Sequence, residues 1–362
     1  MKEINFLVQQ LNAGGIEKAI CLLANSFAKR EFQVKIYSLL SSDMIIKLED
    51  EIDVIFLTKF ESDKKRKHSL MYRFRRKVFS FYRLIQLIKK MRNSIIISSR
   101  NEYSTLLSKY GNNSQLRIAQ LHHDHLFNKK LLCDFKYKYQ NIDYFVHLTD
   151  ISKNEIEKLV RPYNQRTKFI TIPNYVMPYN CEDYKRNNYV ISVGRFSHEK
   201  GFLRLLDVWA KVVNKNKEWK LLLIGDGPEM NFIKEKMLKL NISEYVECPG
   251  FLDNKEVMRL LNKSKIYAMP SYTEAFPFTL VEAMQNKLPA VSFDVRIGPQ
   301  VLIDNDKNGF LVEDDNVDLF AEKLLTLMDN PLLLKEFSNK AFEKSEDFLE
   351  ENVIKKWIDI LL

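Results

Sequence analysis

Short apolar runs alternate with helical patterns along almost the whole chain. Examples of these runs are INFLVQQL at residues 4–11, SIIIS at 94–98, YVISVG at 189–194 and KLLLIGDG at 220–227. Alternation of strands with helices is typical of α/β layers whose sheets are largely parallel. We therefore predict an α/β fold, in which ligands bind beyond the carboxyl ends of the strands.

The alternation pauses near residues 175–188 and then restarts with YVISVG. A chain of 362 residues is long enough for two domains that each bury a core. We predict a first domain over residues 1–178, a second over 188–344 and a C-terminal helix over 345–362. In that helix Val353, Trp357 and Leu361 fall on one stripe.

The composition is that of a globular protein, with 46% hydrophobic and 28% charged residues. No apolar run approaches the roughly 18–20 residues that cross a bilayer, and the opening MKEINFLVQQLNAGG does not resemble a signal peptide. The cysteines are scattered and show no metal-ligand spacing: Cys21, Cys133, Cys181 and Cys248. We expect a reduced, cytoplasmic protein without disulfides.

The net charge of +9 is concentrated in one segment. Residues 59–92 hold 13 Lys and Arg against Glu61 and Asp63, which gives +11 there and 9 − 11 = −2 elsewhere. Over 64–92 an apolar stripe runs between the basic residues at helical spacing: Met71, Phe74, Val78, Phe81, Ile85 and Ile88. The helix either packs on the first sheet or also contacts an anionic membrane surface, which we favour. No nucleic-acid motif accompanies the charge, and the lysine-rich 59–67 is a candidate loop.

Two of the predicted loops follow neighbouring runs in the second half. VGRFSHEKGF at 193–202 places Arg195 and Lys200 beside a helix N-terminus, where free N–H groups and the helix dipole favour an anion. IGDGPEM at 224–230 gives a glycine turn, in which Asp226 and Glu229 are turn and helix-start residues. A surface pairing of Arg195 and Lys200 is the alternative.

A third loop, MPSYTEAFPFTLVEAM at 269–284, carries two glutamates. Pro277 fits the first turn of a helix that we predict from Pro277 through Gln285. Glu274 then lies outside the helix and Glu282 more than a turn inside it. If this loop were considered by itself, both glutamates would be interpreted as solvated charges. A ligand with sugar hydroxyls and a diphosphate, however, would fit all three loops together.

Six motifs in order resemble the retaining glycosyltransferases of family four. They are GGIEKA at 14–19, GRFSHEKG at 194–201, GDGPE at 225–229, GF at 250–251, the Glu274-x7-Glu282 segment and DVRIGPQVLIDNDKNGFLV at 294–312. The resemblance implies the GT-B fold, with two Rossmann-like domains facing across a cleft and a C-terminal helix that crosses back to the first domain.

The resemblance also implies roles for residues of the second domain. Arg195 and Lys200 would clamp the donor diphosphate, and Glu282 would bind the ribose. Glu274 would lie near the donor sugar, bordered by Ala275, Phe276, Pro277 and Phe278. The backbone of Gly250, Phe251 and Leu252 would contact the base. Ala275 stands where glycine is commoner in the family, which narrows the room beside the sugar.

In the first domain, the resemblance implies that Gly14 and Gly15 approach the phosphates or the acceptor and that His122 touches the transferred sugar. A tight turn and a structural histidine are the alternatives. His122 is followed by His123, Asp124 and His125, and the sequence does not decide which imidazole faces the site. A zinc site is disfavoured because the helical spacing of zinc-binding histidines is missing.

The resemblance implies a retaining hexosyltransferase with Glu274, Lys200, Arg195 and His122 as catalytic residues. It would use a nucleotide-sugar donor, most simply a UDP-sugar, without a cofactor or metal, because Arg195 and Lys200 replace the divalent ion. The expected acceptor is a polyprenyl-diphosphate-linked glycan of a bacterial surface polysaccharide, reached on the cytoplasmic face of the membrane. A sugar-nucleotide 2-epimerase and a non-catalytic GT-B subunit are the alternatives.

Overall fold

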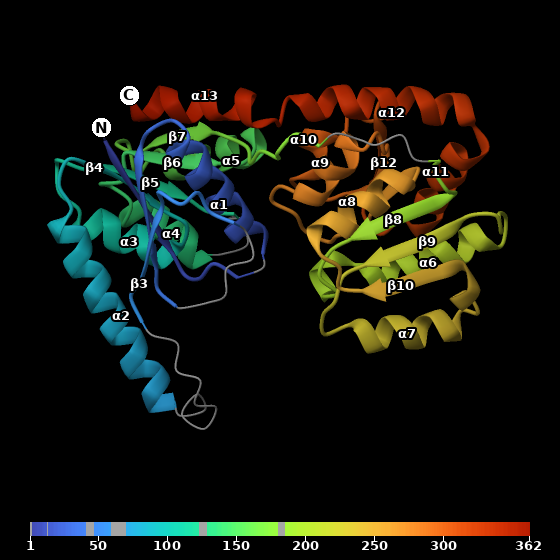
Figure 1. The fold of residues 1–362 in the computed structure, drawn as a ribbon, viewed down its shortest axis with the longest axis horizontal. Coiled ribbons are helices and arrows are strands. Elements are labelled where there is room, and N and C mark those ends of the chain that lie inside the picture. Colours follow the sequence, from blue (N-terminus) through green and yellow to red (C-terminus); the bar gives the residue numbers. More distant parts are fainter. Residues whose placement is uncertain (1, 13, 41–46, 59–69, 123–128, 180–184) are drawn as a thin grey trace. The chain divides into compact units, whose positions relative to one another are not determined.

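The computed structural model describes residues 2–12, 14–40, 47–58, 70–122, 129–179 and 185–362, with the backbone alone at 70–77 (Figure 1). These residues form two compact units. The first contains Met1–Pro173 and Ile354–Leu362, and the second contains Asn174–Val353. The lysine-rich 59–67 and Cys181 lie outside the described residues.

The first unit is built on a parallel sheet of seven strands in the order β3-β2-β1-β4-β5-β6-β7. The strands are β1 (Glu3–Val8), β2 (Gln33–Ser38), β3 (Asp53–Phe56), β4 (Ser94–Ser98), β5 (Leu116–Gln120), β6 (Tyr144–His147) and β7 (Lys168–Thr171). The helices between them are α1 (Gly15–Ala28), α2 (Leu70–Lys90), α3 (Asn101–Tyr110), α4 (Lys129–Tyr137) and α5 (Asp150–Val160). The predicted α/β architecture is confirmed for this unit.

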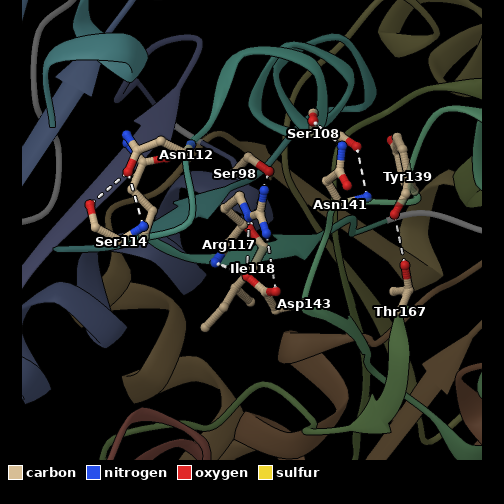
Figure 2. Close-up of polar contacts among 11 residues, drawn as sticks. Ser98, Ser108, Asn112, Ser114, Arg117, Ile118, Tyr139, Asn141, Asp143 and Thr167 are labelled. Carbon is tan, nitrogen blue, oxygen red and sulfur yellow. Dashed lines mark hydrogen bonds and ion pairs between the residues drawn. The ribbon is translucent and has the colours of Figure 1, made fainter. Parts of the chain in front are cut away.

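Polar side chains join the loops at the amino ends of this sheet (Figure 2). Arg117, at the start of β5, donates from Nε to Asp143 Oδ2 at 3.2 Å. Thr167, just before β7, donates from Oγ1 to the carbonyl of Tyr139 at 2.7 Å. These bonds satisfy polar groups near the core. They fix the end of the sheet opposite to the ends where ligands bind in such folds.

The second unit has a parallel sheet of six strands in the order β10-β9-β8-β11-β12-β13. The strands are β8 (Tyr189–Val193), β9 (Lys220–Ile224), β10 (Val246–Gly250), β11 (Ile266–Met269), β12 (Ala290–Asp294) and β13 (Gly309–Glu313). The longer helices are α6 (Phe202–Val213), α7 (Met230–Lys239), α8 (Asn254–Lys263), α9 (Phe278–Gln285), α11 (Val317–Asp329), α12 (Pro331–Glu346) and α13 (Glu350–Leu361). Short helices are η2 (His198–Lys200), η3 (Ser243–Tyr245) and α10 (Pro299–Leu302).

The core of the second unit lies between the sheet and helices α6, α7 and α11. Trp209 on α6 is fully buried there, and its indole N–H donates to the carbonyl of Tyr245 at 3.0 Å. The indole thus buries a large apolar surface without leaving a polar group unsatisfied. The predicted α/β architecture is confirmed for this unit as well.

The C-terminal helix α13 contributes to the first unit from Ile354 onward, as the fold prediction required. Val353, Trp357 and Leu361 are all buried, so the predicted stripe is the packing face. The Trp357 ring meets Phe27 of α1 edge-on, with ring centroids 6.2 Å apart. Lys2 Nζ donates to the carbonyl of Leu361 at 2.7 Å and closes the contact.

The described side chains along the predicted apolar stripe of α2 differ in burial. Toward its C-terminal end Ile88 and Leu84 are buried in the core of the first unit. Val78, however, is more than half exposed, and so are its neighbours Phe79 and Tyr82. The side chains of Met71 and Phe74 are outside the described residues. The part of the chain that the structure describes contains no helix with the length and apolar character needed to span a bilayer.

We expect Trp357→Ala to lower the free energy of unfolding of the first unit by about 3–5 kcal/mol, because it removes a fully buried aromatic side chain. Urea unfolding followed by circular dichroism measures the loss. The remaining tryptophans, Trp209 and Trp219, lie in the second unit, so their fluorescence reports separately on that unit. The exposed Leu362→Ala is the control, and equal stability of the two variants would contradict the packing role of α13.

Candidate functional site

The candidate site lies where the strand order of the second sheet reverses, between β8 and β11. β8 continues to β9 on one side, whereas β11 continues to β12 on the other. The loops that follow β8 and β11 therefore diverge at the carboxyl ends of the strands, which is where open α/β sheets bind ligands. Arg195 and Lys200 lie on the first of these loops and Glu274 on the second.

The structure joins two of the predicted residues directly. Lys200 Nζ lies 2.7 Å from Glu274 Oε1, and Ser271 Oγ donates to the same oxygen at 2.7 Å. The Glu274 side chain is 10% exposed and that of Lys200 is 31% exposed. Gly298 packs against Glu274 so closely that a Cβ there would lie 2.8 Å from Glu274 Cβ. The carboxylate is thus held in one position at the carboxyl edge of the sheet.

The glycine turn after β9 supports the loop that carries Arg195. Phe196 donates its N–H to the carbonyl of Asp226 at 2.9 Å and accepts from the N–H of Glu229 at 2.9 Å. A Cβ on Gly225, whose φ is +146°, would lie 1.8 Å from the carbonyl of Gly194. Asp226 also accepts from its neighbouring N–H in the turn, as predicted for a turn residue. The GDGPE motif therefore positions a neighbouring loop.

The loops after β8 and β11 are also tied to each other. Tyr272 donates its N–H to the carbonyl of Glu199 at 2.9 Å. Its ring stacks on His198, with centroids 5.0 Å apart and planes 8° from parallel. Neither Tyr272 nor Ser271 was a predicted site residue, because nothing in the sequence pairs them with the earlier loop.

Helix α9 begins at Phe278, and Pro277 is its N-cap with φ −80°. The prediction of a helix from about Pro277 through Gln285 is therefore confirmed, with the start one residue later. The rings of Phe276 and Phe278 are buried and pack edge-on at 6.0 Å. These rings anchor the segment in the core, so only its backbone is available to a ligand beside the half-buried Ala275.

Glu282 lies in the second turn of α9 and is almost fully buried. Its carbonyl accepts from Asn286 Nδ2 at 2.8 Å. Burial raises the pKa of Tyr267, on the adjacent β11, and the negative charges of Glu274 and Glu282 act in the same direction. The Tyr267 hydroxyl contacts Thr279 Oγ1 at 2.8 Å.

Gly250, Phe251 and Leu252 leave the carboxyl end of β10, at the outer edge of the sheet. Gly250 has φ +89° and open space where a Cβ would be. Its carbonyl accepts from the N–H of Gly225 at 3.0 Å, and the Phe251 ring is exposed. The segment is therefore available to a ligand, and its contact with a base stays a prediction.

In the first unit, Gly14 is the N-cap of α1 and Gly15 its first residue. The Glu17 carboxylate lies over Gly14, since a Cβ there would lie 2.2 Å from Glu17 Oε2. Burial raises the pKa of Glu17. A phosphate at this helix start would meet that carboxylate, so the predicted contact requires Glu17 to move or to be protonated.

Two histidines of the first unit lie at the carboxyl edge of its sheet. His122 follows β5 and is half-buried, whereas His123, Asp124 and His125 lie outside the described residues. His147 ends β6, where burial lowers its pKa to about 3 and its Nδ1 lies 3.1 Å from Ser152 Oγ. His147 is neutral and structural. The role predicted for His122 stays a prediction.

A family model matches most of the second unit. Residues 182–344 match the family model described as Glycosyl transferases group 1. A Staphylococcus aureus TarM variant solved with fondaparinux, α-GlcNAc-glycerol and UDP is similar with a TM-score of 0.81, at 18% identity and over 99% of both chains. The fold is GT-B. The fold prediction is confirmed, and all candidate residues of the second unit lie within the range that this family model matches.

Two curated relatives are similar over nearly their full length. The amylovoran biosynthesis glycosyltransferase AmsD of Erwinia amylovora is 27% identical over 97% of this chain and 96% of that protein. The GalNAc-alpha-(1->4)-GalNAc-alpha-(1->3)-diNAcBac-PP-undecaprenol alpha-1,4-N-acetyl-D-galactosaminyltransferase of Campylobacter jejuni is 26% identical over 100% and 98%. The relatives of this chain thus include a bacterial glycosyltransferase named for amylovoran biosynthesis and one named for an undecaprenol-linked acceptor.

Two glycines of the second unit allow a matched test of how closely its loops approach each other. Gly201 and Gly250 both have positive φ, but a Cβ on Gly201 would lie 2.0 Å from the carbonyl of Pro270, whereas one on Gly250 would meet nothing within 4 Å. We expect Gly250→Ala to cost about 1–2 kcal/mol of backbone strain. Gly201→Ala should cost clearly more, because the loop that carries Glu274 must shift. Urea unfolding measures both, and equal losses would contradict the close contact.

Proposed function

We propose that this protein is a retaining glycosyltransferase that moves a hexosyl or N-acetylhexosaminyl group from a UDP-sugar to a polyprenyl-diphosphate-linked glycan of a bacterial surface polysaccharide. One observation carries the proposal. Within a glycosyl transferases group 1 domain, Lys200 Nζ and Glu274 Oε1 lie 2.7 Å apart at the reversal point of a parallel sheet. A cation that can bind a diphosphate thus lies beside a carboxylate that can bind sugar hydroxyls. The two must be adjacent because the diphosphate and the sugar of a nucleotide sugar are bonded to each other.

In the proposed reaction the bond between the anomeric carbon and the diphosphate oxygen breaks. The acceptor oxygen bonds to the same carbon on the same face, and its proton passes to the departing diphosphate. Arg195 and Lys200 stabilise the negative charge on the leaving group, which is the main electrostatic demand of the step. These two cations do the work of a divalent metal, so the reaction needs none.

Glu282 binds the ribose in this proposal, and the backbone around Gly250 contacts the base. UDP is the favoured nucleotide because the TarM variant was solved with UDP and has the same fold. A polyprenyl-linked acceptor is favoured because the Campylobacter relative is named for one. We also propose that, in the first unit, His122 touches the transferred sugar and that Gly14 and Gly15 approach the phosphates or the acceptor.

The acceptor requires contact with the cytoplasmic face of a membrane, and α2 supplies a suitable surface. Val78, Phe79 and Tyr82 are each more than half exposed, and the Arg83 guanidinium lies over the Phe79 ring at 4.5 Å. Exposed apolar side chains beside cations match the interface of an anionic bilayer. We name Val78, Phe79, Tyr82 and Arg83 the α2 surface.

Donor chemistry is tested by UDP release with a panel of UDP-sugars and membrane-extracted acceptor, in EDTA and in Mg²⁺. We expect Lys200→Ala to lower kcat by about 10²-fold or more, because it removes charge stabilisation of the leaving group. Glu282→Gln should instead weaken donor binding by about tenfold or more through the loss of a charged hydrogen-bond acceptor.

Lys236→Ala is the matched control for Lys200. Lys236 is 27% exposed and pairs with Asp207 at 2.6 Å, but it lies on α7, away from the reversal point. Wild-type turnover in Lys200→Ala would discredit the diphosphate assignment. Epimer formation without UDP release would support a sugar-nucleotide 2-epimerase. UDP binding without turnover would support a non-catalytic GT-B subunit.

Membrane contact is tested by sedimentation with phosphatidylcholine vesicles, with and without phosphatidylglycerol. Serine at Val78, Phe79 and Tyr82 together should lower vesicle binding by about tenfold or more, since each buried apolar side chain contributes up to about 1.5–3 kcal/mol. Neutralising Arg73, Arg75, Arg76 and Lys77 should abolish the preference for anionic lipid. Serine at Phe232, Leu238 and Leu332, which are exposed in the second unit, is the control. Unchanged binding of the α2 variants would leave α2 with a structural role alone.

A further inference from the structure

Arg204, in the first turn of α6, is a charged residue inside the second unit. Only 4% of its side chain is exposed. A buried guanidinium is strongly destabilising unless its charge and its N–H groups are compensated. Its contacts therefore show which parts of the unit depend on it.

The guanidinium connects the first turn of α6 with two loops. Nε donates to the carbonyl of Pro270 at 2.6 Å, and Nη2 donates to the carbonyl of Ser271. Nη1 donates to Asp314 Oδ1 at 2.7 Å and to Asp315 Oδ1 at 2.9 Å, both in the loop after β13. Arg204 itself lies in the first turn of α6, so one side chain connects the start of this helix with the loops after β11 and β13.

Aromatic rings fix the plane of this guanidinium. It lies 3.7 Å from the ring centroid of Tyr272 and 3.9 Å from that of Phe293. His198 in turn stacks on Tyr272. Cation–π contacts are strong when they are shielded from water. The column His198–Tyr272–Arg204–Phe293 thus runs from the loop surface into the core.

We propose that Arg204 is a positioning residue that sets the place of the Glu274 carboxylate; the proposal rests on the proposed function of Glu274. The connection passes through Ser271, whose carbonyl accepts from Arg204 and whose hydroxyl donates to Glu274 Oε1 at 2.7 Å. Arg204 touches no reacting group. It holds the loop after β11 where Glu274 meets Lys200, and thereby controls the sugar end of the donor site.

Lysine cannot replace this arginine. Lysine keeps the positive charge, but its ammonium is a point charge that lacks the planar fork needed to reach two carbonyls and two carboxylates. It also stacks poorly between two rings. Arg204→Lys therefore removes the positioning while keeping the charge.

A matched control lies at the opposite end of the same sheet. Arg186 also joins two loops, since its Nη1 donates to the carbonyl of Ser264 at 3.2 Å and its Nη2 to that of Asn286 at 2.7 Å. Both loops precede strands and lie away from Glu274. Arg186→Lys therefore removes a comparable link without touching Glu274 or the loop that carries it.

The first test is hydrogen exchange of the full-length protein followed by mass spectrometry. In Arg204→Lys, amides of residues 271–276 should exchange at least about tenfold faster than in wild type, because local opening becomes easier. Arg186→Lys should leave them unchanged. If Arg204→Lys fails to fold, Asn at both Asp314 and Asp315, which are exposed, should give the same change in smaller degree. Wild-type protection of residues 271–276 would overturn the proposal, and this result does not depend on activity.

The second test separates positioning from general destabilisation. Arg204→Lys should lower kcat by about 10²-fold, as a misplaced group does, while the affinity for UDP alone stays at the wild-type value. In a Glu274→Gln background the same substitution should lower kcat no further. An additional loss in that background, or a fall in UDP affinity, would contradict action through Glu274. If wild type releases no UDP from any donor, the proposed function fails, and the exchange experiment still decides whether Arg204 positions the loop.

Discussion

The pairing of β8 with β11 determines which loops of the second unit meet. Val190 lies opposite Ile266 and Ile191 opposite Tyr267, although the two strands are far apart in the chain. This register places the carboxyl ends of both strands side by side. Lys200 can therefore reach Glu274, and the hydroxyl of Tyr267, on β11, contacts Thr279 Oγ1. Any change that shifts this register would separate the cation from the carboxylate.

The polar groups at these carboxyl ends are held by contacts with neighbouring loops. Gly225 lies against the carbonyl of Gly194 and Gly201 against that of Pro270, at distances that leave no room for a Cβ. Arg204 then adds the loop after β13 to the same arrangement. A site built in this way is preorganised, because the loops cannot move independently. Preorganisation suits a reaction in which charge develops on a leaving group that the protein does not contact covalently.

The fold was largely predictable because most strands are continuous apolar runs that are buried on both faces of a parallel sheet. Ser94–Ser98, for example, was predicted with the bounds that the structure shows. Two strands lack such a run. β3 is a short edge strand whose Ile55 and Phe56 are exposed, and β13 begins with glycine, so neither has the pattern of a buried strand. The apolar stripe of α2 was predicted as one face, yet among its described side chains Val78 is exposed and Ile88 is buried, because periodicity shows which residues share a face but not which of them are packed.

Within the candidate site, the loops that carry Arg195, Lys200 and Glu274 were predictable from strand–turn–helix patterns, but their pairing was not, since it depends on strand order. Arg204 is a different case. It precedes Val208 and Val212 at intervals of four residues, and both valines are fully buried, so the arginine continues an apolar stripe of α6. A cation at such a position must find acceptors inside the fold. The sequence therefore contained the signal that Arg204 is buried, while its partners, which come from the loops after β11 and β13, could be identified only from the folded chain.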